Sequence, residues 1–130
     1  MERRFPWRHA FFDVTFDGFD NDNGLELKRQ DGIAYLRFLA TEAHARGLSI
    51  GLKNSLDLVS ELVTSFDWAL NEECLQYDEC ESLEPFIEAG KAVFHCEYGS
   101  STNGTCGEAP EGFSTIVKNL DLDAERLTCD

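Results

Sequence analysis

The sequence lacks several features that would each point to a particular class of protein. No run of 18 apolar residues occurs in the 130 residues, so no segment is long enough to cross a membrane as a helix. Residues 1–8 have neither the apolar stretch nor the small-residue cleavage site of a signal peptide. No glycine-rich phosphate loop and no pair of cysteines with C-x-x-C spacing is present. We therefore expect no cofactor, no bound metal and no membrane partner.

Basic residues are also scarce. The chain has 11 Lys and Arg against 25 Asp and Glu, which gives a formal net charge of −14. Nucleic-acid binding needs a basic face, so we expect no nucleic-acid partner. An acidic cleft would concentrate a cationic substrate, although acidity also simply keeps a secreted protein soluble. Residues 1–12 differ from the rest, because they hold three arginines and one glutamate.

Alternating strand and helix patterns follow the basic start. The length fits one domain, and 42% hydrophobic residues suffice for a core. Apolar residues recur at helical spacing over residues 30–46, and Gly47 gives a stop signal. We expect strands at 48–52, 66–70, 92–96 and 113–117, a further one at 11–16, and helices at 56–64, 82–89 and 122–127. This repeat predicts an α/β fold with parallel strands, the first three of the clear ones adjacent in chain order.

Polar residues follow each clear strand, and ligands of parallel α/β folds bind beyond the carboxyl ends of the strands. Lys53, Glu72 and Glu97 are expected to point to one common side there. Glu72 could act as a general acid or base, or be one of many solvated carboxylates. Asn54 could bond a sugar hydroxyl or cap the next helix, and Lys53 could hold a hydroxyl or be a surface charge.

Five cysteines are present, and we expect disulfides between Cys74 and Cys80 and between Cys106 and Cys129. Cys74 and Cys80 flank a five-residue loop, and the second pair lies in the loop-rich C-terminal third. Cys96 falls within a buried strand and is expected to be free. This pattern suits an oxidising compartment; the alternative is five reduced, buried thiols.

Several long blocks stand out between residues 16 and 129: AHARGLSIGLKN (43–54), FDWALNEEC (66–74), YDEC (77–80), GKAVF (90–94) and Glu97-Tyr98. They closely resemble glycoside hydrolase family 114, whose members are known as endo-α-1,4-polygalactosaminidases, and related fungal sequences are often labelled α-galactosidases. The resemblance implies the last four or five strand–helix units of a (β/α)₈ TIM barrel and a retaining glycosidase with two carboxylates. The implied partner is a galactosamine-rich polysaccharide, and the full-length family is secreted.

The resemblance also assigns residues. Glu72 matches the family's acid/base, and the substrate-binding positions are Lys53, Asn54, Asn71, Glu97 and Tyr98. The other catalytic carboxylate is the second Asp of an Asp/Glu-Pro-Asp-Asn motif upstream of the stretch kept here as FDGFDNDNG (16–24). Counted back without gaps, that position falls on Val14. The neighbouring Asp13 is the candidate nucleophile, but a shift of one residue turns a side chain to the opposite face of a strand.

Residues 1–15 resemble nothing in the family, so we expect an unrelated or mispredicted N-terminus before a barrel segment at 16–130. The alternative to an active enzyme is a truncated, inactive fragment or a weak carbohydrate-binding module. With only Glu72 securely matched, we expect the isolated chain not to hydrolyse galactosamine polymers at a family-like rate.

Overall fold

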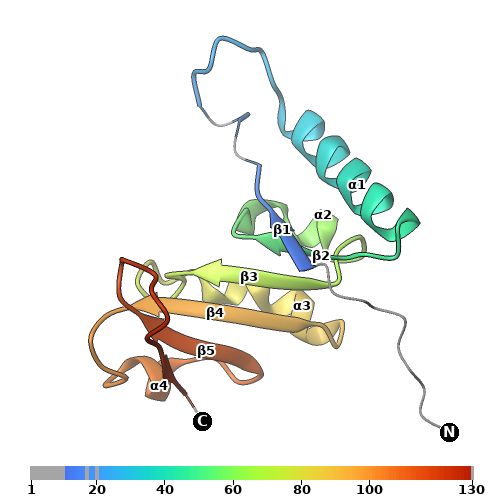
Figure 1. Ribbon diagram of the computed structural model, residues 1–130. Helices are drawn as coiled ribbons and strands as arrows, with labels where there is room; N and C mark the ends of the chain where they lie inside the picture. Colours follow the sequence, from blue (N-terminus) through green and yellow to red (C-terminus); the bar gives the residue numbers. More distant parts are fainter. Residues whose placement is uncertain (1–10, 17, 20, 130) are drawn as a thin grey trace, which may run out of the picture.

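One sheet organises the part of the chain that the computed structural model describes, which is residues 11–16, 18–19 and 21–129. Its six strands follow the chain order β1 to β6 (Figure 1). Their bounds are Phe11–Val14, Ser49–Lys53, Trp68–Glu72, Ala92–Tyr98, Phe113–Lys118 and Leu127–Thr128. The first five strands pair in parallel, and β6 pairs antiparallel with β5. The expected α/β class and the order of the three clear strands are confirmed.

The helix α1, Arg29–Ala45, lies close to its expected range. Asp31 accepts a hydrogen bond from the backbone N–H of Lys28, which satisfies one free donor at the helix start. Gly47 ends the helix at a φ of 68°. The N–H groups of Gly47 and Leu48 donate to the carbonyls of His44 and Ala43, the pair of bonds of a Schellman motif.

Two shorter helices connect the next strands, and each begins with a 3₁₀ turn. The turn η1, Leu56–Leu58, leads into α2, Val59–Leu62, and η2, Cys80–Leu83, leads into α3, Glu84–Glu88. Each turn and the helix after it together cover residues 56–62 and 80–88, close to the helices expected at 56–64 and 82–89. A single turn, α4 at Thr105–Glu108, interrupts the loop before β5. None of the helices in the described ranges is long and apolar enough to span a bilayer.

The two faces of the sheet differ. One packs on the helices α1 to α3, and its core includes Ile50 and Leu52 from β2 and Val93 from β4. In Figure 1, α2 and α3 lie behind the sheet and no helix covers the near face of β3 to β5. Because all the described crossovers lie on one face, the arrangement is that of a barrel segment, whose helices form only the outer layer.

Aromatic side chains cover part of the open face. The Trp68 ring lies over Gly51 so closely that a Cβ on Gly51 would stand 2.3 Å from it. Trp68 and Phe94 contact edge to face with ring centroids 5.6 Å apart. Phe94 is nevertheless 43% exposed. The glycine is therefore required by the close approach of an aromatic ring.

The helix expected at 122–127 is wrong. Leu122 has a φ of 52° within a turn, and the chain then extends into β6. Leu122 and Leu127 are both exposed, so an apolar helix face would have had nothing to pack on. The Cys129 N–H bonds to the Thr115 carbonyl instead, which draws this segment along β5.

Both expected disulfides are confirmed. Cys74–Cys80 spans 6 residues and Cys106–Cys129 spans 23. Cys96 is free and buried, as expected. The first disulfide closes the loop after β3, and the second ties α4 to the end of β6.

The two disulfides should differ in their contribution to stability. The chain-entropy model gives about 3 kcal/mol for the longer loop and about 2 kcal/mol for the shorter one. We expect the double replacement Cys106→Ala with Cys129→Ala to lower the free energy of unfolding more than Cys74→Ala with Cys80→Ala. Denaturant unfolding measures both, with Cys96→Ser as the control that breaks no disulfide. The opposite order would show that native-state packing of the buried Cys74 outweighs loop closure.

Candidate active site

The candidate site lies where β2 and β3 end. A hollow of about 480 Å³ opens there, and its lining residues include Asn54, Asp57, Glu72, Glu73, Tyr77 and Glu79. A second hollow, about 340 Å³, lies between α3 and the start of β5 and is lined by Ile87 and Phe113 among others. Ligands of parallel α/β sheets bind at the carboxyl ends of strands. We therefore place the site at the first hollow.

Glu72 is the last residue of β3, and its carboxylate takes up donors from two neighbouring strands. The Tyr98 hydroxyl donates to Oε1 over 2.5 Å. The Asn54 side-chain amide donates to Oε2 over 3.1 Å, and the Lys53 ammonium lies 3.4 Å from the same oxygen. The side chain of Glu72 is 26% exposed. Three of the other sequence-predicted residues thus gather around the Glu72 carboxylate.

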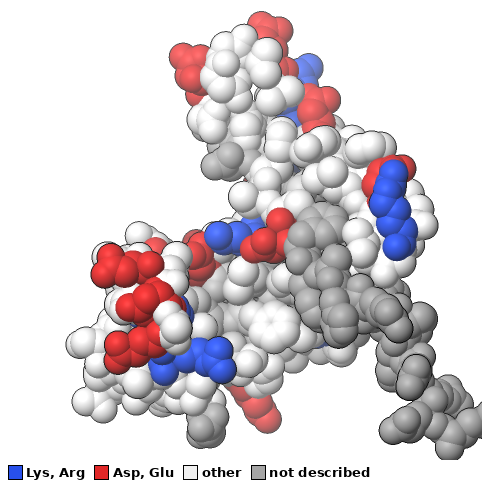
Figure 2. All heavy atoms as spheres, in the orientation of Figure 1, with Lys and Arg blue, Asp and Glu red and all other residues white. Residues whose placement is uncertain are grey.

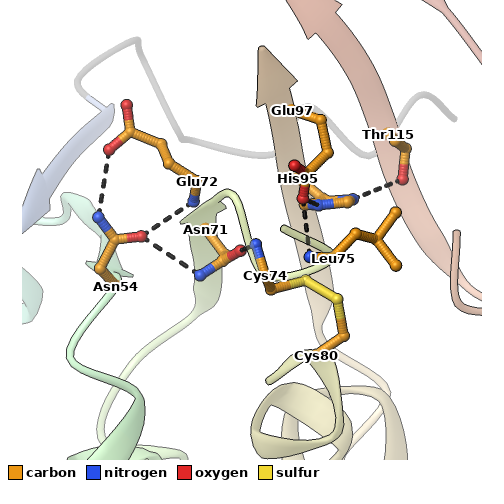
Figure 3. Close-up of a disulfide and its surroundings, with 9 residues drawn as sticks. All are labelled: Asn54, Asn71, Glu72, Cys74, Leu75, Cys80, His95, Glu97 and Thr115. Carbon is orange, nitrogen blue, oxygen red and sulfur yellow. Dashed lines mark hydrogen bonds and ion pairs between the residues drawn. A yellow bond between two sulfur atoms is a disulfide. The ribbon is translucent and has the colours of Figure 1, made fainter. Parts of the chain in front are cut away.

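Asn54 ties the ends of β2 and β3 together. Its Oδ1 accepts the backbone N–H of Glu72 over 2.9 Å and the side-chain amide of Asn71 over 3.3 Å. Its Nδ2 donates to the Glu72 carboxylate, so one side chain fixes both ends of the glutamate (Figure 3). The helix-cap reading of Asn54 finds no support, because η1 has no side-chain cap bond.

Left-handed backbone conformations cluster at this site. Asn54, Ser55 and Glu73 have φ values of 51°, 49° and 66°. Such conformations in residues other than glycine typically cost on the order of 1–3 kcal/mol and persist only where surrounding contacts hold them. Here the contacts are visible, since the N–H of Asn54 donates to the Leu70 carbonyl and that of Glu73 to the Cys96 carbonyl.

Glu97 does not point to the same side as Lys53 and Glu72, which corrects the expectation of one common side. Cys96 is level with Glu72 across the β3–β4 pairing, so the next residue faces the helix layer. Glu97 is 7% exposed, and its Oε1 accepts the Leu75 N–H over 2.8 Å and contacts His95 Nε2 at 2.7 Å. Tyr98 lies on the open face instead, as its bond to Glu72 requires.

Asn71 lies on the helix side too. It is 1% exposed, and its Oδ1 accepts the Cys74 N–H over 3.0 Å. The N–H groups of Glu73, Cys74 and Leu75 therefore each have a fixed acceptor. The disulfide to Cys80 closes the same loop. Asn71 and Glu97 thus hold the loop after Glu72, and lining of a sugar cleft by either remains a prediction.

Asp13 and Val14 fall on opposite faces of β1. Val14 pairs level with Leu52 and packs against the core, whereas Asp13 pairs level with Gly51 and is exposed on the open face. Gly51 is level with Trp68, four residues before Glu72. At about 3.3 Å per residue this sets Asp13 about 13 Å behind Glu72 along the strands. Asp13 and Glu72 do not form an adjacent pair in this register, and the catalytic role of Asp13 stays a prediction.

The hydrogen bonds and the nearby charge around Glu72 favour its ionised form. The hydrogen bond from Tyr98 is the main cause that lowers the pKa of Glu72; the Asn54 amide and the Lys53 charge act in the same direction against partial burial. Burial raises the pKa of the Cys96 thiol, and the nearby carboxylates of Glu72 and Glu97 raise it further. Cys96 therefore stays protonated and is a poor nucleophile. The contacts of Glu72 therefore favour its carboxylate over the protonated acid.

His95 is the residue of this region that the sequence reasoning did not single out. It is 1% exposed and bonds Thr115 through Nδ1 and Glu97 through Nε2. Its strand position, two residues before Glu97, was the available signal, because such residues share a face. Cys74, Cys80 and His95 lie close enough to hold a metal, but both sulfurs are joined in the disulfide and are not thiolate ligands.

Acidic side chains dominate the visible surface near the strand ends. Figure 2 shows Asp and Glu gathered at the left, over the carboxyl ends of β4 and β5 and the loop after β5, with Lys and Arg beside them. The hollow itself is lined by the acidic residues Asp57, Glu72, Glu73 and Glu79. The site therefore faces solvent through an acidic rim.

Comparisons with known proteins agree with this geometry. A family model described as glycoside-hydrolase family GH114 matches residues 9–130. The crystal structure of Aspergillus fumigatus Ega3 in complex with galactosamine is similar, with 37% sequence identity and a TM-score of 0.77. The match covers 86% of this chain and 50% of Ega3, so the chain spans about half the length of that protein. A search of curated proteins finds no significant match.

Glu97 should matter for stability and not for sugar contact. Glu97→Ala leaves the Leu75 N–H and His95 without their buried acceptor, so we expect the free energy of unfolding to fall by about 3 kcal/mol. Glu97→Gln keeps an acceptor oxygen and should cost less. Denaturant unfolding measures both, and the exposed Glu79→Ala is the control, expected within about 0.5 kcal/mol of wild type. A stable Glu97→Ala variant with weakened galactosamine binding would restore the cleft-lining role.

Proposed function

The chain belongs to glycoside hydrolase family 114, and from that premise we propose that it acts as a glycosidase on α-linked polysaccharide containing galactosamine or galactose. One observation carries the proposal: the Glu72 carboxylate stands at the carboxyl end of β3 with donors on both oxygens. The galactosamine bound to the similar Ega3 supports the substrate class. The match covers 50% of Ega3, so the activity of the whole Ega3 protein comes to this chain only as a proposal.

The proposed reaction uses two carboxylates. In its protonated form, which the contacts with Tyr98, Asn54 and Lys53 disfavour, Glu72 gives its proton to the leaving oxygen, and the resulting carboxylate later takes a proton from the attacking water. A second carboxylate roughly 5–5.5 Å away would form the glycosyl-enzyme, as retaining glycosidases do. Lys53 and Tyr98 share the open face with Glu72 and would contact the sugar there, while Asn54 keeps the Glu72 side chain in place.

The charge of the chain supports a cationic substrate. Galactosamine units without an acetyl group carry ammonium groups, and the acidic rim would attract them. The formal net charge of −14 acts in the same direction. The two disulfides support passage through an oxidising compartment, and therefore secretion, as part of the proposal.

A second candidate function is sugar binding without hydrolysis. The register of β1 favours it, since Asp13 lies level with Gly51 and not with Glu72. A carboxylate at that distance could not attack the anomeric carbon of a sugar held at Glu72. Lost positioning of this kind forfeits on the order of 7–11 kcal/mol of barrier lowering.

Hydrolysis and binding should be measured separately on an α-1,4-galactosamine polymer. If the chain is an enzyme, Glu72→Gln should lower the release of oligosaccharides by about 10²- to 10⁴-fold, the usual worth of general acid–base catalysis. Because glutamine has nearly the same shape, polymer binding by Glu72→Gln should remain. The matched control is Glu79→Gln, an exposed residue at the rim of the same hollow.

Each outcome selects one account. Hydrolysis that Glu72→Gln abolishes supports the glycosidase, with Asp13→Asn then testing the nucleophile. Binding without hydrolysis supports the second candidate. Hydrolysis that survives Glu72→Gln removes Glu72 from the mechanism, and neither binding nor hydrolysis removes both functions from this chain.

A further inference from the structure

The two oxygens of the Glu72 carboxylate are held unequally. Asn54 and Lys53 both approach Oε2, at 3.1 and 3.4 Å, whereas Tyr98 is the one side chain of the described ranges that is hydrogen-bonded to Oε1, at 2.5 Å. We propose that Tyr98 is a positioning residue that acts through Glu72, by holding Oε1 in place and leaving the second lone pair of Oε1 as the site of proton transfer. The role of Tyr98 in hydrolysis rests on the proposed function. The effect of its hydroxyl on the pKa of Glu72 does not, and it can be measured without hydrolysis.

The strand geometry makes Tyr98 suited to this role. Cys96 is level with Glu72 in the β3–β4 pairing, and Tyr98 follows two residues later on the same face. Its phenol has one hydroxyl on a rigid ring, so the donor position is set by the backbone of β4. A bond of 2.5 Å from a hydroxyl to a carboxylate lies in the range of charge-assisted hydrogen bonds, which are about twice as strong as neutral ones.

A count of lone pairs identifies the proton site. An ionised carboxylate offers about four acceptor positions, two on each oxygen. Asn54 donates to one position of Oε2, the Lys53 ammonium stands at ion-pair distance from the same oxygen, and Tyr98 occupies one position of Oε1. Among the described residues, no other side chain is hydrogen-bonded to Oε1. Because the Lys53 charge opposes protonation of Oε2, the remaining position on Oε1 is where a sugar oxygen or a water would exchange a proton with Glu72.

The charged and titratable groups around the pair come from three strands and one loop. Lys53 extends from β2, Cys96 lies level with Glu72 on β4, Glu73 follows β3, and Lys118 ends β5 on the far side of Cys96. The hydrogen bond to Glu72 raises the pKa of Tyr98, and burial adds to this. Its hydroxyl therefore keeps its proton and remains a donor to Glu72.

Such coupling has a consequence for the reaction. A retaining acid/base must be protonated in the first step and ionised in the second. Tyr98 stabilises the ionised form, so loss of its hydroxyl should raise the pKa of Glu72. If Glu72 is the general acid, the alkaline limb of kcat/KM then moves to higher pH. If it were the nucleophile, the acidic limb would move to higher pH instead.

The test measures the two groups directly, on the full chain. Carboxyl ¹³C NMR follows the Glu72 midpoint in wild type, Tyr98→Phe and the control Tyr77→Phe, with Glu72→Gln identifying the signal. We expect the Glu72 midpoint to shift upward in Tyr98→Phe and to stay in place in Tyr77→Phe. In the reciprocal arm, ¹³C NMR of the Tyr98 ring should show the phenol ionising at lower pH in Glu72→Gln than in wild type.

These outcomes decide the proposal whether or not the chain hydrolyses a polymer. An unchanged Glu72 midpoint in Tyr98→Phe overturns the coupling. Should that variant unfold, an unchanged Tyr98 ionisation in Glu72→Gln overturns it equally. Where hydrolysis is measurable, movement of the alkaline limb supports the role in catalysis, and coupling with no limb moved overturns that role alone.

Discussion

The parallel pairing of β2, β3 and β4 decides which side chains can meet at the site. In a strand, neighbours alternate between the two faces, and level residues of paired strands share a face. Glu72 therefore shares its face with Cys96 and Tyr98, while His95 and Glu97 are committed to the helix side. The tyrosine that bonds Glu72 and the glutamate that supports its loop are adjacent in sequence, yet they act on opposite sides of the sheet.

That division creates a buried polar layer beneath the carboxylate. The buried polar residues of the core face are Asn71, His95, Glu97 and Thr115, none of them more than 7% exposed. Buried polar groups cost free energy unless they are hydrogen-bonded. The bonds that satisfy them include the ones that fix the loop after Glu72, so the stability of the core and the position of the carboxylate depend on the same contacts.

Much of this arrangement could be predicted from the sequence, and the failures have physical reasons. Helical spacing and glycine stops located α1, and strongly apolar segments located β2 to β5. The disulfides followed from cysteines that flank loops. The expectation that Glu97 points to the same side as Lys53 and Glu72 failed because polar residues at a strand end were counted without their alternation. The helix expected at 122–127 failed because its leucines have no surface to pack on.

The β1 register illustrates a subtler limit. Counting back from FDGFDNDNG placed the second carboxylate at Val14, but Val14 packs on the core and only Asp13 has the parity of the open face. The structure shows which face of β1 each residue occupies. The separation of Asp13 from Glu72 along the strands depends on the register of β1, and sequence spacing alone could not give that register. The position of the Glu72 carboxylate is fixed by three side chains, because Asn54, Lys53 and Tyr98 approach it from neighbouring strands. Three left-handed residues flank this convergence, and backbone hydrogen bonds to the Leu70 and Cys96 carbonyls hold two of them in place. Left-handed backbone and the hydrogen bonds of the carboxylate therefore occur at the same place. This coincidence indicates that the fold fixes the orientation of the Glu72 side chain.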